Sequence, residues 1–378
     1  MILSVCDVEL LRLLAWCGNI QPTTLRGSFD NTTVQNLIGT GLVRVHKNSG
    51  VLTLTPKGRC LIEPDIECPE RCPLSYREDL LQRRLRVANI VMTGYRAQLD
   101  LFAFDLYNLA QGRTLFLPSL SRGRDSNVWG SSRIAALFRL GKCCYGTYNV
   151  FSGVGRLNLE DEEKTLSYCG SQSYSSNKAF FFAGDSYSSA LTELERKSKV
   201  NEGRLISYGE AWQKTLFPVH LLSCDDTGAV QLQIMAQPDY RTRLAQAALK
   251  DKYQPSDVPT WDAFFQGRPF VIAADMDLRR LDTAIRTAQE QGLERIAIAA
   301  LEQQAKTVLI PRYQNTGQAK VFALAPEAVS AVIGRWPIPY VPPRTQFLTK
   351  EGDVVDAPPI RILGKAGGQA GRKVRTLV

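Results

Sequence analysis

The amino-acid sequence predicts a mixed α/β protein, with a small helical module at its N-terminus and a larger α/β domain after it. Helical patterns between 7 and 40 are followed by two short strand patterns. Apolar runs at 179–184, 269–275 and 295–299 have the composition of buried strands. An amphipathic helix at 277–291 connects the last two runs, and such a strand-helix-strand unit is typical of a parallel sheet covered by helices.

Length and composition bound the classes of protein that the chain can represent. Its 378 residues are 44% hydrophobic, which suits two or three folded domains. The formal net charge of +9 favours a polyanionic partner. We expect neither a membrane span nor a signal peptide, since there is no run of eighteen apolar residues and no basic segment before a cleavage site. Nine cysteines without a secreted disulfide pattern favour the cytoplasm.

The N-terminal module starts with two helical patterns. In the first, Asp7 is a candidate N-cap, and apolar residues between Val8 and Trp16 form one stripe that faces inward. The second pattern covers roughly 21–29. Together they predict the first two helices of a compact helical bundle that needs a third element to cover its apolar side.

The third helical pattern begins at Asp30 or Asn31, either of which is a suitable N-cap. Its apolar residues Val34, Leu37 and Ile38 recur at helical spacing and face inward. Its remaining side chains are short hydrogen-bonding groups that we expect on the outer face. They are Thr32, Thr33, Gln35, Asn36 and Thr40.

A β-hairpin is predicted after the third helix. Valines at 43 and 45 precede a turn at 47–50, and leucines at 52 and 54 follow it. Gly58 is expected to end the second strand, before a last helix. The hairpin and its flanks supply several basic side chains on one side, namely Arg44, His46, Lys47, Lys57 and Arg59.

Three helices closed by a basic hairpin resemble the winged helix-turn-helix superfamily, most clearly in Leu-Thr-Leu-Thr-Pro-Lys-Gly-Arg at 52–59. The resemblance implies that the third helix enters a major groove and contacts phosphates or base edges. The cations Arg44, Lys47, Lys57 and Arg59 would then bind phosphate in a salt-dependent way. Many modules of this shape bind proteins instead, so a protein-binding role is the alternative.

A linker follows the module, because prolines occur at 64, 69 and 73. Cys60, Cys68 and Cys72 in this stretch would hold zinc only with a fourth ligand from elsewhere, and incidental thiols are the better interpretation. We therefore predict four parts along the chain. They are a winged helix-turn-helix at 1–63, a linker and connecting helix at 64–110, an α/β domain at 111–336 and a Pro/Gly-rich basic tail at 337–378.

Within the α/β domain the pattern alternates between strands and helices. Residues 143–150 predict a strand, and a helix begins near Leu159. Another helix is predicted at 187–197, and the alternation Val-Gln-Leu-Gln-Ile within 228–235 predicts a further strand. In the tail, glycine-spaced cations at 364–375 suit mobile, non-specific contact with phosphate.

The winged helix, the proline-bearing linker and the segment Arg139–Val150 together resemble the replication-relaxation proteins of mobile elements in Gram-positive bacteria. This resemblance implies that the α/β domain is similar to the restriction-endonuclease fold. It also implies a role in the replication and mobilisation of plasmids or conjugative elements. It transfers no catalytic residue, since no family motif matches a named acidic or tyrosine position of this chain.

Nuclease chemistry has weak candidates in the sequence. Two acid-x-Lys triplets occur, at 162–164 and 195–197, and they would use Mg²⁺ to activate water and polarise a phosphate. The candidate residues are Glu162, Lys164, Asp185, Glu195 and Lys197. Ion pairs on a solvated helix face are the alternative explanation. Only two histidines are present, which argues against a histidine-cluster relaxase, and the chain has no phosphate-binding loop of the Walker type.

The leading hypothesis is therefore a DNA-binding protein of a bacterial mobile element that acts in replication initiation, mobilisation or transcriptional control. Its partner would be double-stranded DNA, with a homodimer or a mobile-element protein as a further partner, and it would need no cofactor. The alternatives are a metal-dependent nicking or cleaving nuclease, with Mg²⁺, and a non-enzymatic assembly adaptor.

Overall fold

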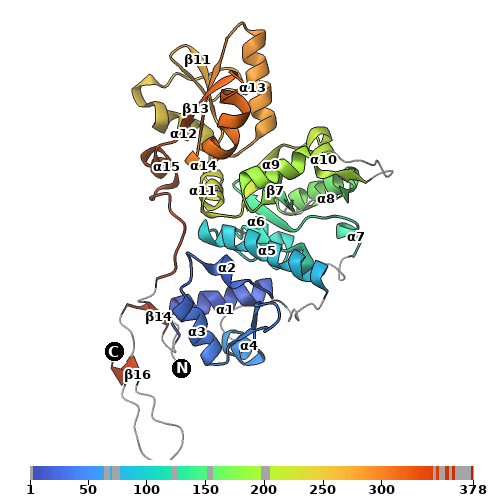
Figure 1. The fold of residues 1–378 in the computed structure, drawn as a ribbon, viewed down its shortest axis with the longest axis vertical. Helices are drawn as coiled ribbons and strands as arrows, with labels where there is room; N and C mark the ends of the chain where they lie inside the picture. The colour runs from blue at the N-terminus through green and yellow to red at the C-terminus, as the bar shows by residue number, and fades with distance from the viewer. Residues whose placement is uncertain are drawn as a thin grey trace, which may run out of the picture. The chain divides into compact units, whose positions relative to one another are not determined.

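A computed structural model describes most of the chain, in ten ranges: 3–63, 69, 77–120, 126–150, 156–196, 205–343, 346–348, 354–356, 360–361 and 376–377. The protein is a mixed α/β fold, as predicted (Figure 1). Contacts within the chain divide it into two compact units. The first comprises Met1–Ala88 with Tyr340–Val378, and the second is Asn89–Pro339. The second unit begins within the connecting helix rather than at residue 111.

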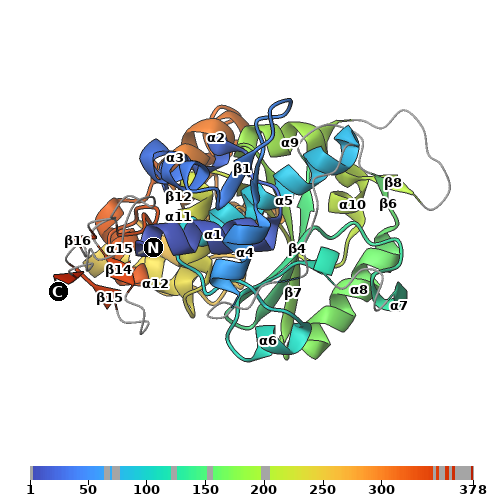
Figure 2. The ribbon, with the colours of Figure 1, turned by 90° about the horizontal axis from the view of Figure 1, so that it is seen from below.

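The first unit contains the elements of a winged helix-turn-helix in the predicted order (Figure 2). They are α1 (Val5–Cys17), α2 (Pro22–Leu25), α3 (Asn31–Gly39), β1 (Val43–Val45), β2 (Leu52–Leu54) and α4 (Pro56–Ile62). The inner faces of the helices and strands share a core that includes Leu10, Leu14, Leu25, Leu37 and Val51, each almost completely buried. Burial of such side chains stabilises the module by about 1.5–3 kcal/mol each.

Two helix boundaries differ from the prediction. Ser4, not Asp7, caps α1: the Ser4 hydroxyl accepts from the Asp7 amide at 3.0 Å, and the Asp7 carboxylate accepts from the Ser4 amide at 2.9 Å. This reciprocal pair satisfies two amides that the helix leaves unpaired. The second helix, expected over 21–29, is only one turn long, because the backbone becomes extended at Arg26 and Gly27 adopts a φ of 86°.

Gly58 does not end the wing strand as expected; it lies inside α4, which Pro56 begins. A Cβ atom at position 58 would lie 2.3 Å from the Leu42 carbonyl oxygen and 2.9 Å from the Leu54 side chain. Glycine therefore allows α4 to pack directly against the start of β1. The hairpin register pairs Val43 with Leu54 and Arg44 with Thr53, which puts Arg44 on the face opposite the valines.

Part of the predicted tail is attached to the winged helix. The Gln346 carbonyl accepts from the Val5 amide at 2.9 Å, and the Tyr340 hydroxyl donates to Glu9 at 3.2 Å. Short strand pairs follow, β14 (Phe347–Leu348) with β15 (Val354–Val355) and β16 (Ile360–Arg361) with β17 (Thr376–Leu377). The glycine-spaced cations at 364–375 lie outside the described residues.

The second unit begins within α5 (Glu78–Arg96), at Asn89, and contains two larger sheets. In the first, an antiparallel part, β3 (Leu115–Phe116), β4 (Ala136–Leu140) and β5 (Cys143–Asn149), continues in parallel through β7 (Asn177–Gly184) and β9 (Val219–Ser223). The connecting elements are α6 (Leu106–Ala110), η1 (Pro118–Leu120), α7 (Ser126–Trp129), β6 (Arg156–Leu157), α8 (Leu159–Gln172), α9 (Tyr187–Glu195), β8 (Ile206–Ser207) and α10 (Tyr208–Lys214). The strands predicted at 143–150 and 179–184 and the helix predicted near Leu159 are confirmed, and the helix predicted at 187–197 is α9, which ends at Glu195.

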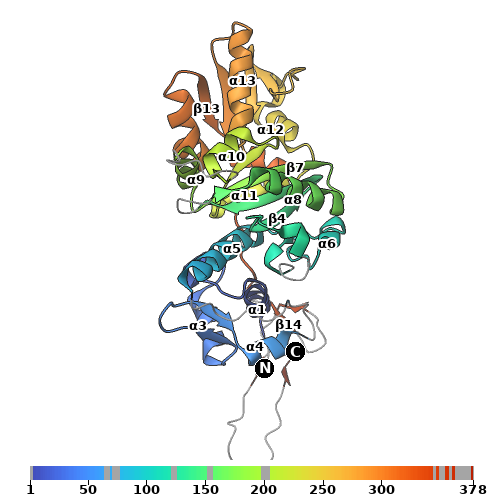
Figure 3. The same ribbon diagram turned by 90° about the vertical axis from the view of Figure 1, so that its right-hand side faces the viewer.

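The second sheet contains the predicted strand-helix-strand unit. Its order is β10 (Ala263–Phe265), β11 (Arg268–Ile272), β12 (Ile296–Ala300) and β13 (Ala319–Ala323), with the last three parallel. The helices are α11 (Asp226–Met235), α12 (Tyr240–Leu249), η2 (Lys250–Lys252), α13 (Leu278–Glu290), α14 (Glu302–Gln304), the π-helix η3 (Ala305–Gln314) and α15 (Pro326–Ile333). Alternate strand residues enter two different cores, one shared with α13 and η3 and the other with α11, α12 and α15. Figure 3 shows the strand β13 with the helices α12 and α13 of this part of the unit.

The predicted strand at 228–235 is wrong, because these residues form α11. Asp225 caps this helix by accepting from the Gly228 amide at 3.0 Å. All residues from 228 to 235 are buried, so the alternation of apolar and glutamine residues does not separate a solvent-exposed face from a buried face. The glutamines are instead held inside the unit: the Gln231 amide donates to the carbonyl oxygens of Leu221 and Asp275, at 2.9 and 3.0 Å.

Candidate nucleic-acid interface

Three of the polar side chains that the sequence predicts on the outer face of α3 are unpaired. Asp30 caps it by accepting from the Thr33 amide at 2.6 Å, and Val34 and Leu37 are buried beneath it. Among the predicted outer residues, those whose side chains are exposed and form no hydrogen bond with any described residue are Thr32, Gln35 and Asn36. Side chains of this kind bind both phosphates and base edges.

Two residues predicted on this face are used within the protein. Thr33 is half-buried, and its hydroxyl lies 3.8 Å from the Cys6 thiol of α1. The Thr40 hydroxyl donates to the Asn36 and Leu37 carbonyl oxygens, at 2.9 and 3.1 Å, and so closes the last turn of α3. Thr33 therefore faces inward in part, contrary to the prediction. Thr40 is exposed but already bonded.

The wing, whose first strand β1 contacts α3, carries two cations without a carboxylate partner. Arg44 on β1 and Lys47 in the turn are exposed, and neither forms an ion pair with a described residue. His46, between them, bonds through Nε2 with the Thr53 hydroxyl at 2.9 Å. Partial burial, and then the charge of Arg44, lower the pKa of His46. Histidine is therefore neutral here at neutral pH and adds no charge to the wing.

The other two predicted cations are engaged in the fold. Lys57 Nζ donates to the Thr40 carbonyl oxygen at 2.8 Å, at the C-terminus of α3, where the helix dipole favours a positive charge. Arg59 pairs with Glu63 at 2.5 Å and also donates to the Pro69 carbonyl. Four cations that look equivalent in the sequence thus fall into an available pair, Arg44 and Lys47, and a pair that stabilises the module.

Acidic residues are absent from the segment 31–54, which spans α3, β1 and β2. The four acids of residues 3–63 are Asp7, Glu9, Asp30 and Glu63. The interactions described above engage each of them: the first accepts from the Ser4 amide, the second accepts from Tyr340, the third caps α3, and the fourth pairs with Arg59. The face formed by α3 and the wing is therefore polar and cationic, without a carboxylate that would repel phosphate.

The nuclease candidates that the structure describes belong to the second unit. Glu162 is only 1% exposed, and it accepts hydrogen bonds from the hydroxyls of Ser132 and Tyr148, at 2.7 and 2.9 Å, and from the Arg133 amide at 2.5 Å. Burial, together with the Glu162 charge, raises the pKa of Tyr148 well above its usual range. Glu162 thus joins α8 to the chain before β4, a structural role that the sequence did not indicate.

The remaining candidates are on the surface or outside the described residues. Lys164 pairs with Glu160 at 2.6 Å on the exposed side of α8, and Glu195 pairs with Arg312 at 2.7 Å. Asp185 is exposed just after β7, and Lys197 lies outside the described ranges. Cys60 is exposed, while Cys68 and Cys72 also lie outside these ranges. Within the part of the chain that the structure describes, no three His, Cys, Asp or Glu residues form a group that could hold a metal ion.

A buried ionic cluster centres on Asp275, just after β11. Its carboxylate is fully buried and accepts from the Tyr240 hydroxyl at 2.8 Å and from Arg241 Nε at 2.7 Å, with Arg280 at 4.0 Å. The Asp275 carbonyl oxygen lies 3.0 Å from His220 Nδ1 on β9. Burial alone would raise the pKa of Asp275, but the charges of Arg241 and Arg280 outweigh burial and hold it well below its usual range.

Shifted pKa values often mark catalytic sites, but the contacts of this cluster assign it a structural role. The described contacts of the Asp275 carboxylate come from α12, from α13 and from the backbone between β11 and α13. Asp275 therefore joins the second sheet to α12, and through its carbonyl to β9 of the first sheet.

Acid should weaken this cluster. Since the folded pKa of Asp275 lies below the unfolded value of about 3.9, its contribution to stability is complete above that pH and is lost as pH falls toward the folded pKa. We expect the free energy of unfolding to fall below about pH 4, and to fall less steeply in an Asp275→Asn variant. Urea unfolding at a series of pH values measures both slopes. Equal slopes would show that Asp275 does not titrate in this way.

None of the helices in the described ranges combines the length and apolar character that a membrane span requires. Comparison of the chain with protein-family models, with curated proteins and with solved structures finds no significant match.

Proposed function

We propose that the chain is a double-stranded DNA-binding protein that docks α3 in a major groove and holds the adjacent phosphates with its wing. One observation carries this proposal. The outer face of α3 leaves Thr32, Gln35 and Asn36 unpaired within the described chain, and Arg44 and Lys47 lie in the neighbouring wing with no carboxylate in the whole segment 31–54. A helix of this kind fits the major groove, which is about 12 Å wide.

The biological setting that we propose is a bacterial mobile element, a plasmid or a conjugative element. The support for it is the combination of the winged helix with an α/β unit that contains the strand Cys143–Asn149, the elements on which the likeness to replication-relaxation proteins rests. In that setting the protein would act in replication initiation, mobilisation or transcriptional control. The second unit would serve to form a homodimer or to bind another protein of the element, in the cytoplasm.

The chemistry of α3 favours adenine over guanine in the recognised site. Glutamine and asparagine make paired hydrogen bonds with adenine, whereas guanine is read mainly by arginine and lysine, and α3 contains neither. We expect Gln35→Ala and Asn36→Ala each to remove the preference for one base pair, by about 1–3 kcal/mol, while binding at low salt persists. Selection of random duplexes by the full chain, followed by titration of the enriched sequence, measures this change.

An exposed glutamine in the second unit provides the control, because Gln289→Ala on α13 should leave the base preference unchanged. Unaltered preference in both the Gln35 and Asn36 variants would show that α3 does not read bases. If wild-type protein fails to shift any duplex at low salt, DNA binding itself is refuted and the adaptor role is favoured.

A further inference from the structure

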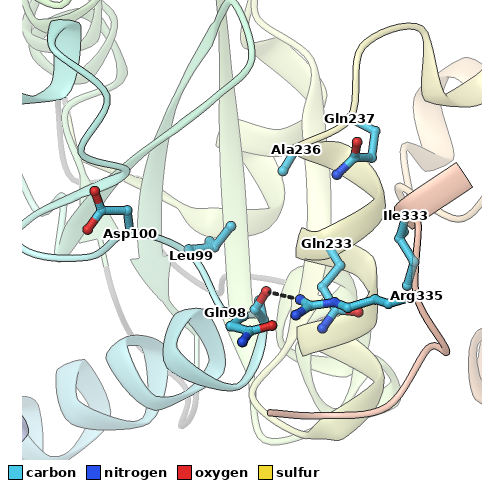
Figure 4. A pocket seen from close by; sticks show the side chains of 9 residues that line it. Gln98, Leu99, Asp100, Gln233, Ala236, Gln237, Ile333 and Arg335 are labelled. Carbon is cyan, nitrogen blue, oxygen red and sulfur yellow. Dashed lines mark hydrogen bonds between the residues drawn. The ribbon is translucent and has the colours of Figure 1, made fainter. Parts of the chain in front are cut away.

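A cavity of about 340 Å³ lies within the second unit, where the chain after α5 meets α11 and the end of α15 (Figure 4). Its volume is at the lower end of the range for sites that hold small organic molecules. Figure 4 shows the side chains of Gln98, Gln233 and Arg335 at one end of the cavity and Asp100 farther away. Three features of these residues indicate which chemistry the cavity would accept.

The first feature is a cation without a counterion. Gly334 ends α15 with a φ of 75° and turns the chain, so that Arg335 lies against the end of α5. Arg335 Nη2 donates to the Ala97 carbonyl oxygen at 3.0 Å, but Arg335 forms no ion pair with any described residue. Partial burial lowers its pKa. Asp100, the acid that lines the cavity, is instead paired with Arg113 at 2.5 Å.

The second feature is a buried acceptor without a donor. Gln233 is only 3% exposed, and its Nε2 donates to the Ile338 carbonyl oxygen at 3.4 Å. Its Oε1 has no hydrogen-bond donor among the described residues. A buried carbonyl oxygen in this state is unfavourable unless a ligand supplies an N–H or O–H group.

The third feature is a strained backbone that positions an amide. Gln98 follows α5 in the left-handed conformation, with a φ of 59°, at a position that usually holds glycine. The Gln98 amide donates to Tyr95 O at 2.8 Å and the Leu99 amide to Gly94 O at 3.2 Å, the paired bonds that end a helix in this way. Because position 98 holds glutamine and not glycine, the strained backbone places the side-chain carboxamide of Gln98 at the cavity.

We propose that this cavity binds a small organic anion, whose carboxylate or phosphate group pairs with Arg335 and whose hydrogen-bond donor reaches Gln233 Oε1. A guanidinium suits either kind of anion, because its planar N–H groups match two oxygens at once. The side-chain carboxamide of Gln98 would supply a further contact. The proposal concerns the second unit and does not depend on DNA binding.

Calorimetric titration of the full chain with acetate, glycolate, adenosine 5′-monophosphate and inorganic phosphate tests the proposal. Acetate carries the anion alone, whereas glycolate adds a hydroxyl donor, so a requirement for both groups appears as tighter binding of glycolate. Nucleotide and phosphate separate a phosphate-bearing ligand from a carboxylate. We expect saturable binding of at least one probe at one site, weakened about tenfold or more by Arg335→Met and by Gln233→Leu.

Three further variants keep the result interpretable. Arg295→Met removes an exposed arginine elsewhere and should bind as wild type. An Arg44→Ala/Lys47→Ala variant should also retain binding, which separates the cavity from the wing. Gln98→Gly keeps the left-handed backbone without the amide, so it should fold with an equal or higher melting temperature and yet bind more weakly. Absence of saturable binding by all four probes at millimolar concentration, or wild-type binding by Arg335→Met, would overturn the proposal.

Discussion

Replacement of Asp275 by alanine is expected to destabilise the Asn89–Pro339 unit by about 3–5 kcal/mol. The variant leaves Arg241 without its buried carboxylate partner, leaves Arg280 with Asp262 alone, and leaves the Tyr240 hydroxyl without its acceptor. An unpaired buried charge is far more unfavourable than a lost surface ion pair, because water cannot replace the missing partner. A loss of this size is a large fraction of the stability of an ordinary domain.

Urea unfolding followed by tryptophan fluorescence measures this effect, since four of the five tryptophans belong to the second unit. Glu302→Ala is the matched control: it also removes a carboxylate from an ion pair, with Lys306, but that pair is exposed. The control should leave the unfolding midpoint unchanged. If Asp275→Ala and Glu302→Ala unfold at the same urea concentration, the cluster does not hold the unit together.

The sequence did not reveal the Asp275 cluster, although it placed Asp275 at the end of a predicted strand. The partners Tyr240 and Arg241 lie on α12, a helix for which no pattern was recognised, and His220 lies on β9, which was not predicted either. Such clusters are formed by residues distant in the chain. Periodicity describes neighbours in one element and carries no information about which elements meet.

The segment at 228–235 illustrates the same limit within one element. Alternation of apolar and polar residues predicts a strand only if one face of the segment is exposed to solvent. In α11 every residue of this stretch is buried. The glutamines are accommodated because Gln231 finds carbonyl acceptors across the core, whereas Gln233 lies at the cavity with one atom unpaired. Because this segment is buried on all sides, it has no difference between an exposed and a buried face, and the prediction depended on that difference.

The winged helix was predicted more completely because its signals are local. Asp30 at the start of α3 and the turn at 47–50 each fix the backbone through a neighbour in the sequence, whereas α4 begins at Pro56, before the expected end of the strand at Gly58. The sequence could not assign roles to the cations. Lys57 and Arg59 meet Thr40 and Glu63 only in the folded module, so composition alone overstated the number of available phosphate ligands.

Reversal of the two available wing cations, in an Arg44→Glu/Lys47→Glu variant, is expected to weaken duplex binding by about a hundredfold or more at moderate salt. Each phosphate contact contributes about 0.9 to the slope of log affinity against log salt, so the loss of two contacts should lower the slope by about two. Fluorescence anisotropy with a labelled duplex over a range of salt concentrations measures both quantities. Neither cation pairs with a described residue, which leaves the fold of the module intact.

The control for this variant has the same change in net charge at two exposed cations of the second unit, Arg295→Glu/Lys252→Glu. Long-range attraction of DNA by the whole protein would weaken similarly in both variants, whereas contact by the wing affects only the first. Lys57→Glu is a less specific test, because it places a carboxylate against the Thr40 carbonyl and disturbs the end of α3. Equal salt slopes in the wing variant and its control would remove Arg44 and Lys47 from the interface.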